Sequence, residues 1–114
     1  MIIEDIKKYT DVPVVVVDNQ GIFTYVNDKF CSVFGWQQHN ILGQSLTLII
    51  PPNLHDAHNM GFSRFLSTEK PTLLGKPLKL KAVDSSGKEF IAEHFIVAEK
   101  INGHWYFAAT IKPL

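Results

Sequence analysis

The sequence predicts an α+β fold, in which two β-strands, a group of short helices and three further strands follow one another. Residues 12–26 are rich in β-branched side chains on both sides of a turn, and residues 27–67 carry apolar side chains at helical spacing. From residue 75 onward, apolar side chains alternate with polar ones. The chain has 114 residues, of which 46% are apolar and 19% charged, and these values suit one domain with one core.

Residues 1–10 are predicted to form a flanking helix, and residues 11–114 the domain itself. Ile2, Ile3 and Ile6 recur at helical spacing, but so short a helix is not stable without a surface that covers its apolar stripe. Because the helix has few residues of its own to pack against, we expect the stripe to be buried across a homodimer interface.

A β-hairpin and two short helices are predicted next. Residues 12–18 and 22–26 have the composition of paired strands, and the turn-forming sequence Asn-Gln-Gly lies between them. Asn27 or Asp28 can cap the first helix, which carries an apolar stripe and ends at a glycine. The second helix is predicted over residues 38–42.

A longer helix is predicted from Pro51 and Pro52, which suit a helix start, to Ser67. Its apolar face contains a histidine. The residues that share this narrow arc are Leu54, His58, Phe62 and Phe65. His55 is rotated away from the arc by roughly 60°, at 100° per residue.

Three strands complete the prediction. Leu78, Leu80 and Ala82 alternate with lysines, and a turn at residues 84–87 follows. The next strand places Phe90, Ala92, His94, Ile96 and Ala98 on one face. Asn102-Gly103 is the strongest hairpin signal in the chain and leads into a last strand over residues 105–111.

Composition argues against several classes of function. The 11 basic and 11 acidic residues balance, so no positive field favours nucleic acid. The single cysteine, Cys31, cannot form an internal disulfide or a cysteine zinc cage, which favours a reducing, cytoplasmic location. The apolar stretch at residues 12–17 is too short to span a membrane, so we expect no membrane insertion by this domain.

Three segments together resemble the PAS family. VVVVDNQGIFTYVNDKFCSVFGW (residues 14–36) resembles the PAS opening, with its strand, Asp, turn glycine, second strand, Asn and aromatic-rich helix. ILGQSL (residues 41–46) resembles the segment before the middle helices, and VDSSGKEFIAEHFIV (residues 83–97) resembles the Asp-x-x-Gly hairpin with its Phe-bearing strand. The ordered set is more specific than any one motif.

The resemblance implies a five-stranded antiparallel sheet in the order 2-1-5-4-3, with helices on one face that enclose a pocket. It also implies a sensory, dimerising module of the kind found in bacterial two-component systems. Such a module is fused to, or partnered by, an effector such as a kinase, cyclase, chemoreceptor or transcriptional regulator, none of which fits within 114 residues. The fold alone does not name the ligand.

Residues 51–75 resemble the proximal helix and following loop of the FixL-type haem PAS domains. The position that matches the iron-ligating histidine is His58, which also lies on the apolar arc of its helix. Haem is therefore the leading specific ligand candidate, with His58 as its metal ligand. One position departs from the FixL pattern, because Leu78 stands where that family has its ligand-switching arginine.

His94 shares the inward face of its strand with apolar residues, and we expect it on the distal side of such a pocket. It could donate a hydrogen bond to a ligand or complete bis-histidine ligation opposite His58. Arg64 could pair with a haem propionate. The remaining predicted pocket residues are Phe62, Phe65, Leu73, Ile96 and Trp105. The alternative for each histidine is a core residue that bonds a backbone carbonyl.

Other chemistries have weaker support. The middle helices lack the cysteine that flavin photochemistry through a cysteine adduct requires. His55 and His58 could offer two nitrogens to a metal, but no third ligand lies at a recognisable spacing. No Gly-x-Ser-x-Gly elbow or Gly-rich phosphate loop is present, so an enzyme is not predicted. Two classes remain, a ligand sensor and a ligand-free dimerisation module.

Overall fold

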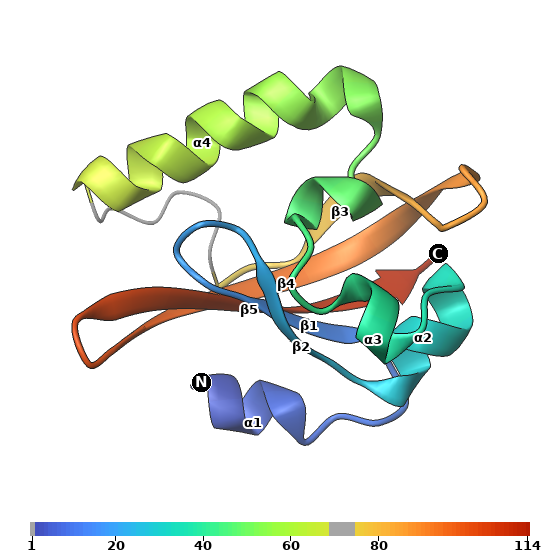
Figure 1. The fold of residues 1–114 in the computed structure, drawn as a ribbon, viewed down its shortest axis with the longest axis horizontal. Helices are drawn as coiled ribbons and strands as arrows, with labels where there is room; N and C mark the ends of the chain where they lie inside the picture. The colour runs from blue at the N-terminus through green and yellow to red at the C-terminus, as the bar shows by residue number, and fades with distance from the viewer. Residues whose placement is uncertain (1, 69–74) are drawn as a thin grey trace.

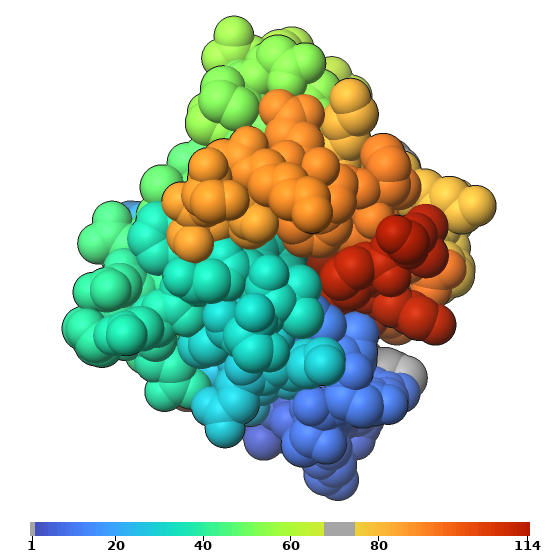
Figure 2. Space-filling view, turned by 90° about the vertical axis from the view of Figure 1, so that its right-hand side faces the viewer, coloured from blue at the N-terminus to red at the C-terminus, as the bar shows by residue number. Residues whose placement is uncertain are grey.

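A computed structural model describes residues 2–68 and 75–114. Its centre is a five-stranded antiparallel sheet in the order β2-β1-β5-β4-β3 (Figure 1), which confirms the predicted fold class and strand order. The strands are β1 (Val14–Val17), β2 (Phe23–Val26), β3 (Leu78–Val83), β4 (Glu89–Ile101) and β5 (His104–Pro113). The C-terminal end of β5 reaches the surface between the β3–β4 segment and the N-terminal segment (Figure 2).

The helices divide between the two faces of the sheet. The segments are α1 (Ile3–Lys7), α2 (Asp28–Phe34), α3 (Gln38–Ile41), the 3-10 turns η1 (Leu46–Ile49) and η2 (Pro52–Leu54), and α4 (His55–Thr68). In Figure 1, α4 lies above the sheet and α1 below it. We call these sides the inner face and the outer face. No helix in residues 2–68 and 75–114 is long and apolar enough to cross a membrane.

The inner face carries the larger core, in which aromatic rings from α2 are central. Phe30 and Phe34 are stacked with their ring centroids 4.5 Å apart, and Phe34 also contacts Phe90 of β4 at 5.3 Å. Phe23 of β2 lies 6.0 Å from Phe30. Since all these rings come from positions with apolar periodicity in the sequence, the hydrophobic pattern and the core agree.

α1 packs on the outer face of its own sheet. Ile3 and Ile6 are buried against Val14, Val16, Val97 and Ala108. The N-terminal end of the helix is held by Glu99 of β4, whose carboxylate accepts a hydrogen bond from the Ile3 N–H at 3.0 Å. The expectation that this helix has too little of its own chain to pack against is therefore wrong, because the outer face of the sheet supplies the surface.

Asn27, and not Asp28, caps the N-terminus of α2. Its Oδ1 accepts from the N–H of Phe30, in the first turn of α2, and also from the N–H of Val14, both at 2.9 Å. Its Nδ2 donates to the carbonyl oxygens of Tyr9 at 3.2 Å and Val12 at 2.9 Å. One buried amide therefore joins α2, β1 and the segment that follows α1.

Leu80 differs from its prediction. It pairs with Ala92 across β3 and β4, so it lies on the inner face as the alternation indicated. It is nevertheless 41% exposed. The reason is its place on β3, which is an edge strand of the sheet. The alternation of apolar and polar residues predicts which face of the sheet a side chain lies on. How exposed the side chain is depends on whether another element covers that face.

The β4–β5 hairpin has the turn that the sequence predicted. Ile101 pairs with His104, so Asn102 and Gly103 form a two-residue loop. Both have positive φ, 52° for Asn102 and 81° for Gly103, as a type I′ turn requires.

Replacing Gly103 with Val is expected to lower the free energy of unfolding by roughly 1–3 kcal/mol, since a β-branched side chain at positive φ is strained. Urea denaturation measures the loss. Gly61→Ala is the control, because Gly61 lies within α4 with nothing within 4 Å of an added Cβ. That change is expected to stabilise by about 0.5–1 kcal/mol. An unchanged stability for Gly103→Val would contradict the turn assignment.

Candidate functional site

The inner face of β4 and β5 forms a floor with several small side chains. On β4 the inward positions include Ala92, His94, Ile96 and Ala98, and on β5 they include Phe107, Ala109 and Ile111. The three alanines carry the smallest side chains of this floor. This floor lies below α4 (Figure 1).

Aromatic rings join the floor to α4. Phe62 contacts Phe107 with centroids 5.0 Å apart, and Phe65 contacts Trp105 at 5.0 Å and Phe107 at 5.1 Å. The structure therefore brings together three of the predicted site residues, and Ile96 packs against the same core. Phe107 was not predicted as a site residue. Its period-two spacing from Trp105 was the signal that could have found it.

The two histidines of α4 have different surroundings. His55 Nε2 lies 2.7 Å from the carbonyl oxygen of Ile50, so His55 holds the turn that precedes the helix. His58 is stacked on Phe62 at 5.9 Å. Its Nδ1 is buried and has no hydrogen-bond partner within residues 2–68 and 75–114. Of the two side chains, His58 is the one with a buried nitrogen left to meet a ligand.

Burial also lowers the pKa of His58, because the charged imidazolium is disfavoured away from water, although the neighbouring Asn59 side chain partly offsets this. The side chain is therefore neutral at physiological pH. A neutral imidazole is the form that ligates a metal.

His94 is tied to its own strand. Its Nδ1 lies 3.1 Å from the carbonyl oxygen of Ala92. A carbonyl only accepts, so Nδ1 carries the proton and the neutral ring keeps a lone pair on Nε2. Burial lowers the pKa of His94, with the Ala92 hydrogen bond as a smaller opposing effect. In this state Nε2 can accept a hydrogen bond or bind a metal, whereas donating to a ligand would require the disfavoured charged form.

The other candidate residues are placed less centrally. Arg64 lies on the exposed side of α4. Leu54, expected on the apolar arc, is 37% exposed. Leu73 lies outside the described residues. Leu78 pairs with His94 across β3 and β4. The position that matches the FixL-type arginine is thus the immediate cross-strand neighbour of His94.

Further polar groups bear on the chemistry of the site. The indole Nε1 of Trp36, after α2, is buried without a hydrogen-bond partner in the described part of the chain. Cys31 lies on α2, and burial raises the pKa of its thiol, with the nearby Asp28 adding to this. Among residues 2–68 and 75–114, no three His, Cys, Asp or Glu side chains gather as they would around a bare metal ion.

His58 and His94 lead us to expect that the free energy of unfolding decreases as the pH drops below about 6.5. Because their folded-state pKa values are lowered from 6.5, the unfolded state binds more protons as the pH decreases through this window. Their contribution is present above pH 6.5 and is lost as the pH falls through the folded-state pKa values. Urea midpoints measured from about pH 7.5 to about pH 5 test this.

In the double variant His58→Leu, His94→Leu, we expect a flatter pH profile in that window. His104→Gln is the control, because His104 is exposed at the hairpin and should leave the slope unchanged. An equally steep profile in the double variant would assign the effect to other groups.

The comparisons with known proteins agree on one family. The family model described as PAS fold matches residues 2–91. A curated relative, the sensor protein FixL of Bradyrhizobium diazoefficiens, is 23% identical over 100 residues, which cover 88% of this chain and 20% of that protein. The chain therefore spans about a fifth of the length of that relative.

Solved structures show the same fold. A PAS domain from Desulfitobacterium hafniense superposes with a TM-score of 0.77 at 14% identity, covering 96% of this chain and 99% of that one. The LOV protein of Rhodobacter sphaeroides superposes with a TM-score of 0.68 at 16% identity, covering 96% of this chain and 63% of that one. At these identities the similarity concerns the fold alone.

Proposed function

Because this chain belongs to the PAS family, we propose that it is a sensory domain that binds a small ligand between α4 and the inner face of the sheet. Haem is the leading specific ligand. The occupied site would bias the packing of α4 on the sheet and so pass a signal to a fused or partner effector. Effectors of the kinase, cyclase, chemoreceptor or regulator type fit this role. We propose that the domain is located in the cytoplasm. We do not propose a catalytic role for it.

The observation that carries the haem proposal is the buried Nδ1 of His58, for which residues 2–68 and 75–114 provide no hydrogen-bond partner. A neutral imidazole beside an aromatic ring, on the side of the sheet whose floor is mostly apolar, is a donor and a polarity that suit haem. When bound, haem supplies an iron that takes gaseous or protein ligands. In this proposal His58 holds the iron, Phe62 and Phe65 exclude water, and Arg64 pairs with a propionate.

His94 takes the distal role in this proposal. His94 pairs across β3 and β4 with Leu78, which stands at the position of the FixL-type arginine. The polar side chain of His94 is therefore on the strand next to that position. Since its Nδ1 faces the Ala92 carbonyl, Nε2 is left with a lone pair. This favours ligation by His94 over hydrogen-bond donation to a bound gas.

Absorption spectra of protein from cells supplied with a haem precursor test the proposal. We expect a Soret band in the unaltered chain, its loss in His58→Ala, and its retention in the matched control His55→Ala. His94→Leu should keep the haem but convert a six-coordinate spectrum to a five-coordinate one. A protein that takes up no haem on reconstitution would reject haem, and haem binding unchanged by His58→Ala would reject His58 as the ligand.

A ligand-free homodimerisation module is the alternative, and the direct contacts of Phe62 and Phe65 with Phe107 favour it. In that case the core below α4 is dry, and the exposed Ile2 and Tyr9 of the outer face lie at the interface. Ile2→Lys tests this without unfolding the domain, since Ile2 is 50% exposed. If the unaltered chain sediments as a monomer at tens of micromolar, a concentration at which modules of ordinary affinity dimerise, dimerisation is contradicted.

A further inference from the structure

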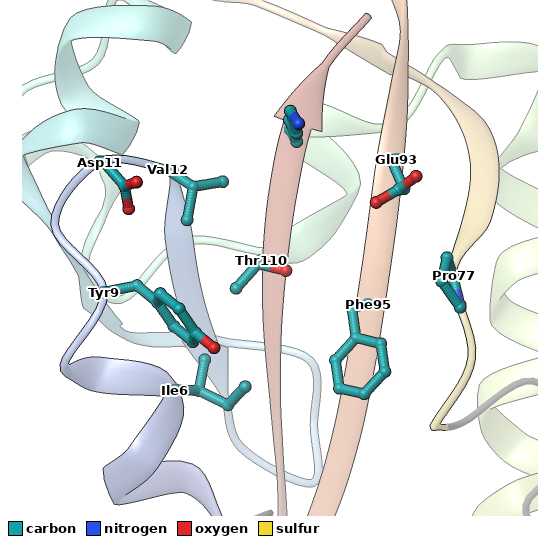
Figure 3. Close-up of a pocket in the computed structure, with 9 residues that line it drawn as sticks. Ile6, Tyr9, Asp11, Val12, Pro77, Glu93, Phe95 and Thr110 are labelled. Atoms are coloured by element: carbon teal, nitrogen blue, oxygen red, sulfur yellow. The ribbon is translucent and has the colours of Figure 1, made fainter.

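A cavity lies on the outer face, on the opposite side of the sheet from α4. It has a volume of about 430 Å³, within the range of small-ligand sites. Figure 3 shows a trough with Thr110 of β5 at its floor. Ile6, Tyr9 and the segment after α1 form one wall, and Glu93 and Phe95 of β4 form the other (Figure 3).

The wall beside α1 is held in place by buried groups. Asn27 Nδ2 donates to the backbone carbonyls of Tyr9 and Val12, both of which line the trough. Ile6 is fully buried against the sheet. Because the backbone that carries Tyr9, Asp11 and Val12 is already fixed, a ligand in the trough would not have to order it.

The charges of the trough are arranged in two groups. Glu93 lies in register between Lys79 on β3 and Lys112 on β5, so two lysines flank it along this row, of which Lys112 lines the trough. Asp11 stands on the other wall. Within residues 2–68 and 75–114, neither Asp11 nor Lys112 forms an ion pair. The lining therefore holds one cation, Lys112, and two anions, with Glu93 in register between two lysines and Asp11 on the opposite wall.

We propose that this trough binds a small zwitterion with an apolar or aromatic group, such as an aromatic α-amino acid. The carboxylate of the ligand meets Lys112, and its ammonium group meets Asp11. Its side chain lies between the rings of Tyr9 and Phe95, above Thr110. A simple amine would leave Lys112 without a counter-charge, and a simple carboxylate would leave Asp11 without one and would also face Glu93.

This site is independent of haem binding, since it lies on the other side of the sheet. Its ligand would contact α1 through Ile6 and Tyr9 and the sheet through Phe95 and Thr110. A ligand that bridges these elements binds more tightly when α1 is docked on the sheet than when α1 is detached from it. The trough thus couples a metabolite to the position of α1.

Amide NMR titrations test the proposal with three matched probes: L-phenylalanine, phenethylamine and 3-phenylpropionate. We expect L-phenylalanine to shift signals of Tyr9, Phe95 and Thr110, and to bind at least about tenfold more tightly than either singly charged analogue. Lys112→Ala and Asp11→Asn should each weaken L-phenylalanine binding by about tenfold or more. Both residues are exposed, so their variants are expected to fold.

Lys81→Ala is the matched control, because Lys81 is an exposed lysine of β3 that pairs with Ile91 and does not line the trough. It should leave L-phenylalanine binding unchanged. No shifts at about 10 mM ligand, equal binding of phenethylamine, or shifts confined to α4 and the inner face would each overturn the proposal. Because the haem test is spectroscopic and uses inner-face variants, failure of one proposal leaves the other standing.

Discussion

Replacing Asn27 with Ala is expected to lower the free energy of unfolding by about 3–5 kcal/mol. The side chain makes four hydrogen bonds to backbone groups, and a methyl side chain offers none of these groups a hydrogen-bond partner. Loss of a helix cap costs about 1 kcal/mol, and each buried group left unpaired adds about 1–3 kcal/mol where water cannot reach it. Urea denaturation followed by circular dichroism measures the change.

Two further variants separate the contributions. Asn27→Asp keeps the oxygen that accepts from Val14 and Phe30 but loses both donors, so an intermediate loss is expected. Asn40→Ala removes an exposed amide from α3 and should change stability by less than about 0.5 kcal/mol. A loss of under about 1 kcal/mol for Asn27→Ala would contradict the role of this side chain as the link between α2, β1 and residues 9–12.

Much of the fold could be predicted because its signals are local. The apolar spacing over residues 90–98 and the Asn102-Gly103 turn each specify a strand or a turn from neighbouring residues, and the structure has the strand β4 and a two-residue turn there. The predicted solvent-facing side of β4 is not uniformly exposed, because Val97 is buried beneath α1. The covering of α1 could not be predicted in this way. Its apolar stripe indicates that some surface is needed, but Ile3 lies more than 90 residues from Val97 in sequence. Whether the surface belongs to the same chain is decided by tertiary packing.

The candidate site was predicted unevenly for similar reasons. Helical spacing placed His58 beside Phe62, and strand parity placed His94 on the face of Ala92 and Ile96. Leu54 left the arc because it lies in the 3-10 turn η2, whose three residues per turn change the phase before α4 begins. The hydrogen bond between His55 and the Ile50 carbonyl joins a side chain to a turn, which no apolar period reveals.

Replacing Phe107 with Ala is expected to lower the free energy of unfolding by about 3–5 kcal/mol and to loosen α4. Phe107 lies on the central strand β5, paired with Val17 on one side and Ala98 on the other. Its ring is 8% exposed and contacts both Phe62 and Phe65. Because the neighbouring inward positions at 98 and 109 are already alanines, little side chain is available to fill the space left behind.

Phe95→Ala is the matched control for this variant. It removes the same side chain from the neighbouring strand, but on the outer face, where Phe95 is only half-buried. We expect a smaller loss, about 1–2 kcal/mol, and no change in the hydrogen exchange of α4 amides. In Phe107→Ala those amides should exchange faster, because α4 loses the one β5 ring that both Phe62 and Phe65 contact and keeps only the contact of Phe65 with Trp105 among these ring pairs. Unchanged hydrogen exchange would mean that other contacts hold α4 on the sheet. It would contradict the proposal that Phe107 links the pocket to the packing of α4.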